Sequence, residues 1–332
     1  MRAVTYDRYG GVDQLRVTEV AVPAPGPSEV LVAIAATGIN LSDWEGLRGR
    51  PAYARLAGGL RTPRRRILGS DIAGTVVGVG EKVERFGAGD EVYGDNLALM
   101  GGFAEYAVAP ESALAHKPAG LSFAEASAVP QPGAIAACAV ALAAPGQRVL
   151  INGAGGGSGV FAIQLAKSTG LHVTAVDNAG KLDFLRDLGA DEVIDYRTQD
   201  FTRSGKYDLV IDLVAHRSVF AYRRALAPGG RYAMVGGTMR ALLRVLTVGR
   251  VVGALTGTKL GLLIVRQGPD HFAPVADRIL SGEIAVHIDS SHPLAEVPAA
   301  LERHGTGRAL GKVVIEVRPG GPAGPAPISS PG

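Results

Sequence analysis

The order of hydrophobic and polar positions divides the chain into two parts near residue 120. In the first part, short apolar runs alternate with polar positions and are separated by turns rich in Gly and Pro. This pattern predicts strands at 17–22, 29–34, 75–79, 90–94 and 103–108, with a loop entering a short helix at 35–44 and no clear period at 48–66. Many short strands joined by glycine turns are typical of a small antiparallel, barrel-like domain.

In the second part the apolar spacing becomes helical from about residue 122 to 141, and strands then alternate with helices. The predicted strands are 149–151, 172–176, 192–195, 208–213, 231–235, 260–265 and 311–317, and the predicted helices are 160–166, 181–188, 218–226, 270–281 and 294–304. Alternation of this kind predicts a parallel sheet covered by helices on both faces.

A glycine-rich stretch lies between the first of these strands and the first helix. Five glycines occur within 153–159, spaced as Ala154-x-Gly156-x-x-Gly159. Gly156 would let the backbone approach a pyrophosphate, and Gly159 would let helix and strand pack closely. Asp177 follows 18 positions after Gly159, where a dinucleotide fold holds the ribose hydroxyls. A plain flexible loop is the alternative, but the flanking strand and helix and the later carboxylate favour a dinucleotide site.

Composition narrows the class of protein. The chain has 332 residues, 47% of them hydrophobic and 20% charged, as expected of a soluble globular protein. Its net charge of +3 is too small to indicate a nucleic-acid partner, and no apolar run is long enough to indicate a membrane partner. The single cysteine, Cys138, excludes an internal disulfide and a multi-cysteine zinc site. The N-terminus has no signal pattern, so we expect a cytoplasmic protein.

Several further motifs accompany the glycine stretch, at 1–4, 23–32, 38–43, 68–74, 89–94, 102–106 and 188–196. Together they resemble the zinc-independent branch of the medium-chain dehydrogenase/reductase superfamily, the quinone oxidoreductase (zeta-crystallin-like) group, over about residues 1–317. The resemblance implies an α/β fold, in which a Rossmann doubly wound parallel sheet is joined to a GroES-like, mostly antiparallel β substrate domain. It implies a substrate domain at 1–120, a Rossmann domain at 121–265 and a return to the substrate domain at 266–318. The Pro- and Gly-rich tail at 319–332 is predicted to be disordered.

The resemblance bears on zinc because zinc-dependent relatives carry a Cys in the first loop and a Gly-His-Glu further on. The matching positions here are Asn40 and the Gly-Ser-Asp at 69–71. A catalytic zinc needs about three N, S or O ligands that converge on one point. We therefore expect no metal. Without a Lewis acid, hydride addition to an activated C=C or to a quinone is favoured over alcohol oxidation.

The resemblance also implies four residues at the nicotinamide end of the cleft: Asn40, Asp43, Trp44 and Tyr53. Asn40 would hydrogen-bond a substrate carbonyl, and Tyr53 would protonate the α-carbon, with water as the alternative donor. Asn40 and Asp43 fit a turn and helix cap as well, and Trp44 fits core packing as well.

For the cofactor, the resemblance implies contacts from Gly156, Gly157, Ser158, Gly159, Val160, Asp177, Asn178, Lys181, Tyr196, Val214, Gly236, Gly237, Thr238, Gly311 and Lys312. Ile135 replaces the threonine that steadies the nicotinamide in relatives. Lys181 and Tyr196 match positions that hold the 2′-phosphate of NADPH, whereas Asp177 would repel that phosphate and bind a 2′-hydroxyl. The balance favours NADP(H) slightly, with NAD(H) as the alternative.

These observations predict a two-domain oxidoreductase that reduces a small enone, enoyl compound or quinone with NAD(P)H, as a homodimer like its relatives. A zinc-free alcohol or ketone reductase is a second hypothesis. A non-catalytic, nucleotide-bound regulatory or structural protein is a third, from a different class. Four arginines at 61–66 fit an acidic substrate or, more simply, a solvated basic loop.

Overall fold

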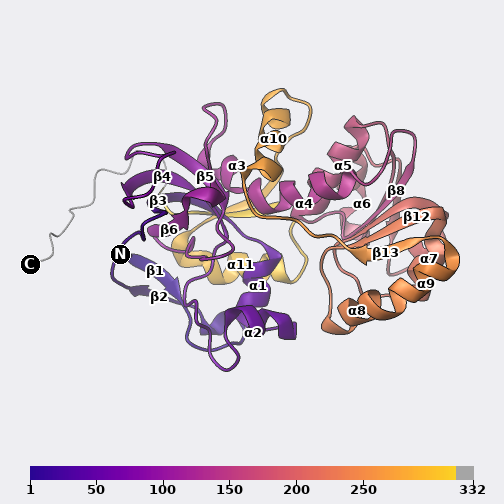
Figure 1. The fold of residues 1–332 in the computed structure, drawn as a ribbon, viewed down its shortest axis with the longest axis horizontal. Coiled ribbons are helices and arrows are strands. Elements are labelled where there is room, and N and C mark those ends of the chain that lie inside the picture. The colour runs from indigo at the N-terminus through magenta and orange to yellow at the C-terminus, as the bar shows by residue number, and fades with distance from the viewer. Residues whose placement is uncertain (319–332) are drawn as a thin grey trace, which may run out of the picture.

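Two lobes, each built on one large sheet, make up the computed structural model, which describes residues 1–318 (Figure 1). The first lobe contains mainly antiparallel strands in the order β14-β15-β3-β4-β5-β7, and β6 also pairs with β3. Their bounds are β3 Glu29–Gly38, β4 Asp71–Val79, β5 Glu91–Asp95, β6 Tyr106–Pro110, β7 Leu114–His116, β14 Ile288–Pro293 and β15 Lys312–Glu316. A separate hairpin pairs β1 (Arg2–Thr5) with β2 (Arg16–Glu19).

The C-terminal strands belong to the first lobe although they follow the second lobe in sequence. Strand β15 pairs antiparallel with β3, with Val314 opposite Gly38. Val313 and Ile315 are buried in the same core cluster as Val30 and Val32 of β3. The helices of this lobe are α1 Leu41–Arg48, α2 Ala52–Gly58, α3 Phe123–Ser127 and α11 Val297–Gly305. The chain thus returns to the first lobe through the pairing of β15 with β3.

The second lobe is a parallel sheet in the order β10-β9-β8-β11-β12-β13. The strands are β8 Arg148–Asn152, β9 His172–Asp177, β10 Glu192–Asp195, β11 Tyr207–Asp212, β12 Leu226–Met234 and β13 Lys259–Leu262. The helices are α4 Pro130–Val140, α5 Gly157–Ser168, α6 Leu182–Asp187, α7 Val219–Ala225, α8 Met239–Arg244, α9 Arg250–Thr256 and α10 Pro269–Leu280, and a π-helical turn, Val245–Gly249, joins α8 to α9.

Alternate residues of the central strands point to opposite faces of this sheet. Val149 and Ile151 of β8 pack in one cluster with residues of α4, α5 and α10. Leu150, between them, packs in another cluster with residues of α7 and with Tyr232. Both faces of the sheet are thus covered, as expected for a parallel sheet. The predicted fold class, a Rossmann doubly wound sheet plus a GroES-like substrate domain, is confirmed.

Several elements differ from the sequence-based expectation, among them α2 within the stretch 48–66 that has no clear period, and the short strand β7. The helical segment 239–256 lies where no element was predicted, and so does the edge strand β14. Strand β3 also runs four residues beyond the predicted end at 34. The predicted disorder of 319–332 falls outside the described residues. Within residues 1–318, no helix has both the length and the apolar character needed to cross a bilayer.

Close packing at the start of α5 generates a test of the fold. A Cβ atom on Gly159 would lie 2.4 Å from the Ala154 carbonyl oxygen and 2.6 Å from its Cα atom. Because these are backbone atoms, they cannot move aside as a side chain would. We expect Gly159→Ala to lower the free energy of unfolding by about 1–3 kcal/mol.

The measurement is urea-induced unfolding of Gly159→Ala beside a matched glycine variant. Gly87→Ala serves as the control, because a Cβ there meets no atom within 4 Å and its backbone conformation suits any residue. An equal change in the two variants would contradict the packing argument.

Candidate functional site

A cleft of about 1850 Å³ is lined by residues of both lobes. The second lobe contributes the glycine loop at 153–158 and the ends of β9, β11 and β12. The first lobe contributes α1, α2 and the segment 303–312. The carboxyl ends of parallel strands, where ligands bind in open α/β sheets, therefore face the substrate domain.

The glycine loop has the geometry of an anion-binding turn. Gly153 has a left-handed φ of 83°, and Gly156 caps the N-terminus of α5 in an extended conformation. The first N–H groups of a helix have no intrahelical partner, so Gly157 and Ser158 present theirs to the cleft that they line. These residues fit the diphosphate of a dinucleotide.

Asp177 holds this loop in place from the end of β9. Its Oδ2 atom accepts a hydrogen bond from Gly155 N at 2.9 Å, and its Oδ1 atom accepts one from Asn178 N at 2.8 Å. The carboxylate lines the cleft but is largely buried. It lies at the position from which a Rossmann fold contacts the adenosine ribose.

Lys181 lines the cleft, but its side chain is largely buried. Its Nζ atom donates to Ala309 O at 2.7 Å and to Gly155 O at 3.5 Å, and lies 3.9 Å from Asp177 Oδ2. Burial lowers the pKa of this ammonium, and the Asp177 charge opposes that shift. The side chain thus connects the glycine loop to the segment before β15.

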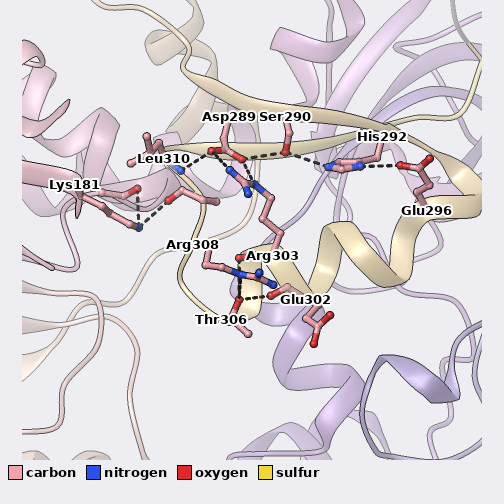
Figure 2. Close-up of polar contacts among 12 residues, drawn as sticks. Lys181, Asp289, Ser290, His292, Glu296, Glu302, Arg303, Thr306, Arg308 and Leu310 are labelled. Carbon is pink, nitrogen blue, oxygen red and sulfur yellow. Dashed lines mark hydrogen bonds and ion pairs between the residues drawn. The ribbon is translucent and has the colours of Figure 1, made fainter. Parts of the chain in front are cut away.

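Further polar contacts fix that segment (Figure 2). Gly311 N donates to Gly155 O at 3.0 Å, so backbone joins backbone across the two lobes. The Asp289 carboxylate, on β14, accepts hydrogen bonds from the Arg303 guanidinium on α11 and from Leu310 N at 3.0 Å. These bonds hold the loop between α11 and β15 against the dinucleotide loop.

Lys312 forms the centre of a buried polar network beneath the cleft. Its Nζ atom donates to Ile39 O and to Asn40 Oδ1, each at 2.7 Å, and lies 3.9 Å from Asp71 Oδ2. Only 2% of its side chain is exposed and Asp71 is fully buried. Burial raises the pKa of Asp71 and lowers that of Lys312, and their mutual attraction opposes both shifts. The stem of Lys312 also passes the glycine loop, since a Cβ on Gly157 would lie 2.7 Å from its Cδ atom.

The network continues toward the cleft through polar side chains. Asn40 Nδ2 donates to Ser70 Oγ at 3.0 Å, and Ser42 Oγ lies 3.3 Å from Ser70 Oγ. The backbone N–H of Gln131 donates to the Asp71 carboxylate at 3.1 Å. Asn40, Ser42 and Gln131 line the cleft.

Asp43 has the capping role that its sequence pattern also allowed. Its carboxylate accepts hydrogen bonds from Asn40 N at 2.8 Å and Gly69 N at 2.9 Å. Burial raises the pKa of this carboxyl to about 6, against the lowering effect of the two backbone donors. The group is fully buried and lies outside the cleft lining, so the structure supports a helix cap for Asp43 rather than a substrate contact.

Tyr53 is paired with an acid that the sequence analysis did not single out. Its OH group lies 2.8 and 2.9 Å from the two carboxylate oxygens of Glu45. Burial raises the pKa of Glu45 to about 7, and the hydrogen bond from Tyr53 opposes this. Burial and the Glu45 charge raise the pKa of Tyr53. Both residues line the cleft, so the pair can hold an exchangeable proton there near neutral pH.

Most of the remaining predicted residues line the cleft, and a few lie behind its lining. Trp44 lines the cleft and packs against Gly305, where a Cβ would lie 2.1 Å from the indole ring. Val214 lies on a loop held by the Asp212 carboxylate, which accepts a hydrogen bond from Val214 N at 3.1 Å. The predicted residues that line the cleft are Asn40, Trp44, Tyr53, Gly156, Gly157, Ser158, Asp177, Asn178, Lys181, Tyr196, Val214, Gly236, Gly237, Thr238 and Lys312. Those that do not are Asp43, Gly159, Val160 and Gly311.

Family models match both lobes. One described as an alcohol dehydrogenase GroES-like domain matches residues 26–119, and one described as a zinc-binding dehydrogenase matches residues 188–315.

Known proteins match nearly the whole chain. A chloroplastic quinone-oxidoreductase QR1 of Triphysaria versicolor is 34% identical over 95% of this chain and 98% of its own. A 2-methylene-furan-3-one reductase of Solanum lycopersicum is 34% identical over 96% of this chain and 80% of its own. The solved structure of a quinone oxidoreductase from Coxiella burnetii superposes with a TM-score of 0.86 at 27% identity, covering 96% of this chain and 99% of that one. The chain therefore belongs to the medium-chain dehydrogenase/reductase superfamily, in its quinone oxidoreductase group, and is an oxidoreductase.

Proposed function

We propose that this enzyme reduces an activated C=C bond or a quinone by hydride transfer from a nicotinamide cofactor. One observation carries the proposal: a single cleft contains the dinucleotide loop of one lobe and, on the other lobe, the Tyr53–Glu45 pair with the Asn40 and Ser42 side chains. The relatives named as quinone oxidoreductases and as a 2-methylene-furan-3-one reductase support this substrate class.

The cofactor, when bound, supplies the hydride from its nicotinamide ring. The chain's own groups hold and protonate the acceptor. The Ser42 hydroxyl and the second N–H of the Asn40 amide would donate to the substrate carbonyl, stabilising the enolate that forms as hydride reaches the β-carbon. Tyr53 would give its proton to the α-carbon, and Glu45 would return a proton to the Tyr53 oxygen. One hydride and one proton are added, which completes the reduction of the C=C bond.

We propose further that no catalytic zinc takes part. The positions that hold zinc ligands in related dehydrogenases are Asn40, Ser70 and Asp71 here. Asn40 Oδ1 already accepts a hydrogen bond from the Lys312 ammonium, and Asp71 lies beside the same cation. A second cation would meet the charge of Lys312, so these residues do not fit a zinc ion.

The nucleotide preference follows from the groups around Asp177. The sequence slightly favoured NADP(H), on the basis of Lys181 and Tyr196. In the structure, the Lys181 ammonium donates to Ala309 O and lies 3.9 Å from Asp177 Oδ2, so we infer that it is not free to bind a 2′-phosphate. An anionic phosphate about 4 Å from this carboxylate would meet a repulsion of a few kcal/mol. We therefore propose that the enzyme prefers NADH to NADPH.

The first test is the substrate and its pH dependence. We expect NADH oxidation with enones and quinones in preference to simple ketones, and kcat should fall as the pH rises through about 7, because Glu45 then loses the proton that it passes to Tyr53. Glu45→Gln should remove this fall, and Tyr53→Phe should lower kcat by about 100-fold or more.

Tyr106→Phe is the matched control, since this buried tyrosine of the same lobe lies outside the cleft lining. An unchanged kcat and pH profile in both the Glu45 and the Tyr53 variant would contradict their role and leave water as the proton donor. Turnover of ketones but not enones would instead support the ketone reductase hypothesis.

The second test concerns the nucleotide. Asp177→Ser should raise the ratio of kcat/KM for NADPH over that for NADH by about 100-fold, because removing the carboxylate removes a repulsion worth about 3 kcal/mol. Asp183→Ser, which removes a fully solvated carboxylate of the same lobe, should leave the ratio unchanged. A wild-type enzyme that prefers NADPH would overturn the proposal for NADH.

The third test concerns the metal. Dialysis against a chelator should leave the activity unchanged, because the proposed chemistry uses only hydrogen-bond donors and a fixed ammonium. Elemental analysis should find no stoichiometric zinc in the active protein. Zinc bound in a one-to-one ratio, together with activity lost on chelation and restored by Zn²⁺, would refute this part of the proposal.

A further inference from the structure

The helical segment 239–256 has an unusual outer surface. Its inner side packs on the second lobe through Val245, Gly249 and Gly253, which are buried. Five large apolar side chains on its outer side are exposed, with 40% to 80% of each side chain open to solvent: Leu243, Leu246, Val248, Val251 and Leu255. Single exposed apolar residues are common on proteins, but a row of them along one helix marks an interaction surface.

Basic side chains are interleaved with this row. Arg240, Arg244 and Arg250 are exposed on the same segment. The surrounding sequence reinforces their charge, because residues 213–269 contain nine Lys and Arg residues and no Asp or Glu. A helix that combines exposed leucine and valine with arginine, and carries no acid, has the character of an interfacial helix.

We propose that the outer face of the segment 239–256 docks on the surface of an anionic lipid bilayer. The helix would lie in the plane of the membrane, with Leu243, Val251 and Leu255 entering the boundary between headgroups and acyl chains. Arg244 and Arg250 would pair with the anionic headgroups. Binding of this kind is peripheral.

Charge favours a lipid surface over a second copy of the chain. In a two-fold symmetric contact the same patch meets itself, so arginines would face arginines with no acid from 213–269 between them. A nucleic acid would match the charge but leave the apolar row without a partner, since phosphate contacts are polar. An anionic bilayer matches both features.

The inference revises the expectation, drawn from sequence, that no membrane is a partner. It also goes beyond the proposed function and does not depend on it. The two are neighbours in space, because Met239 and Leu242 of the same segment line the cleft. Figure 1 shows α8 and α9 side by side with β13 at one end of the second lobe, away from the N-terminus. The docked protein would therefore present its cleft close to the bilayer.

The test is flotation of the full chain with vesicles. We expect binding to vesicles of equimolar phosphatidylcholine and phosphatidylglycerol, little binding to phosphatidylcholine alone, and weakening as salt is raised. Leu243→Gln/Val251→Gln/Leu255→Gln and, separately, Arg244→Gln/Arg250→Gln should each reduce the partition coefficient by about tenfold or more. Turnover of a water-soluble enone in free solution should stay unchanged in both, since none of these side chains lines the cleft.

Matched controls come from the first lobe. Arg8→Gln/Arg16→Gln removes two exposed arginines there, and Val17→Gln/Val22→Gln/Val79→Gln removes three exposed apolar side chains. These variants should float like the wild type. The proposal fails if the wild type does not float with anionic vesicles, or if the helix variants float as well as the controls. It fails equally if sedimentation shows a dimer that the leucine variant dissociates while vesicle binding is absent, because the face would then be an interface between copies.

Discussion

The buried ammonium of Lys312 is the group on which the arrangement of the cleft depends. It donates to Ile39 O and Asn40 Oδ1, lies near the Asp71 carboxylate, and passes its aliphatic stem beneath Gly157. Bringing a charge into the protein interior is costly unless nearby groups compensate it. Compensation here comes from β3, α1 and β4, so these elements must be assembled around β15 for the lysine to be buried. The position of the Asn40 side chain is therefore fixed by a residue 272 positions later in the sequence.

The same C-terminal segment fixes the other lobe. Lys181 Nζ reaches Ala309 O, and Gly311 N reaches Gly155 O, so the dinucleotide loop is bonded to the residues directly before Lys312. Asp289 holds this segment through Arg303 and Leu310 (Figure 2). One short stretch of chain thus contacts both the glycine loop of the second lobe and the Asn40 side chain of the first lobe. The relative position of these two groups is thus fixed largely by hydrogen bonds to backbone atoms, which are less variable than contacts between side chains.

The elements with a clear hydrophobic period could be predicted from the sequence, and those without one could not. The strands around Ile151 and Val176 are buried runs bounded by glycine or polar turns, and both are present. Strand β14 could not be predicted because its sequence is polar. It lies at the edge of the sheet, where pairing with β15 stabilises it. The helical segment 239–256 could not be predicted because its apolar residues occur on all sides of the helix, so the sequence shows no helical period. The role of Glu45 could not be predicted for another reason. It contacts Tyr53 only because α1 and α2 pack against each other in the folded protein.

The net charge of the whole chain does not show how its charged residues are distributed. The net charge of +3 indicates nothing about partners, yet it is the sum of +9 within 213–269 and −6 in the rest, which holds 25 basic and 31 acidic residues. Electrostatic attraction falls off within about 10 Å in salt, so a surface responds to the local charge and not to the total. The exposed arginines of 239–256 are thus free to act as a positive patch beside the cleft, while beneath the cleft Lys312 partly compensates the charge of the buried Asp71 carboxylate. Opposite signs of charge within one chain can therefore serve the orientation of the protein and the construction of its cleft separately.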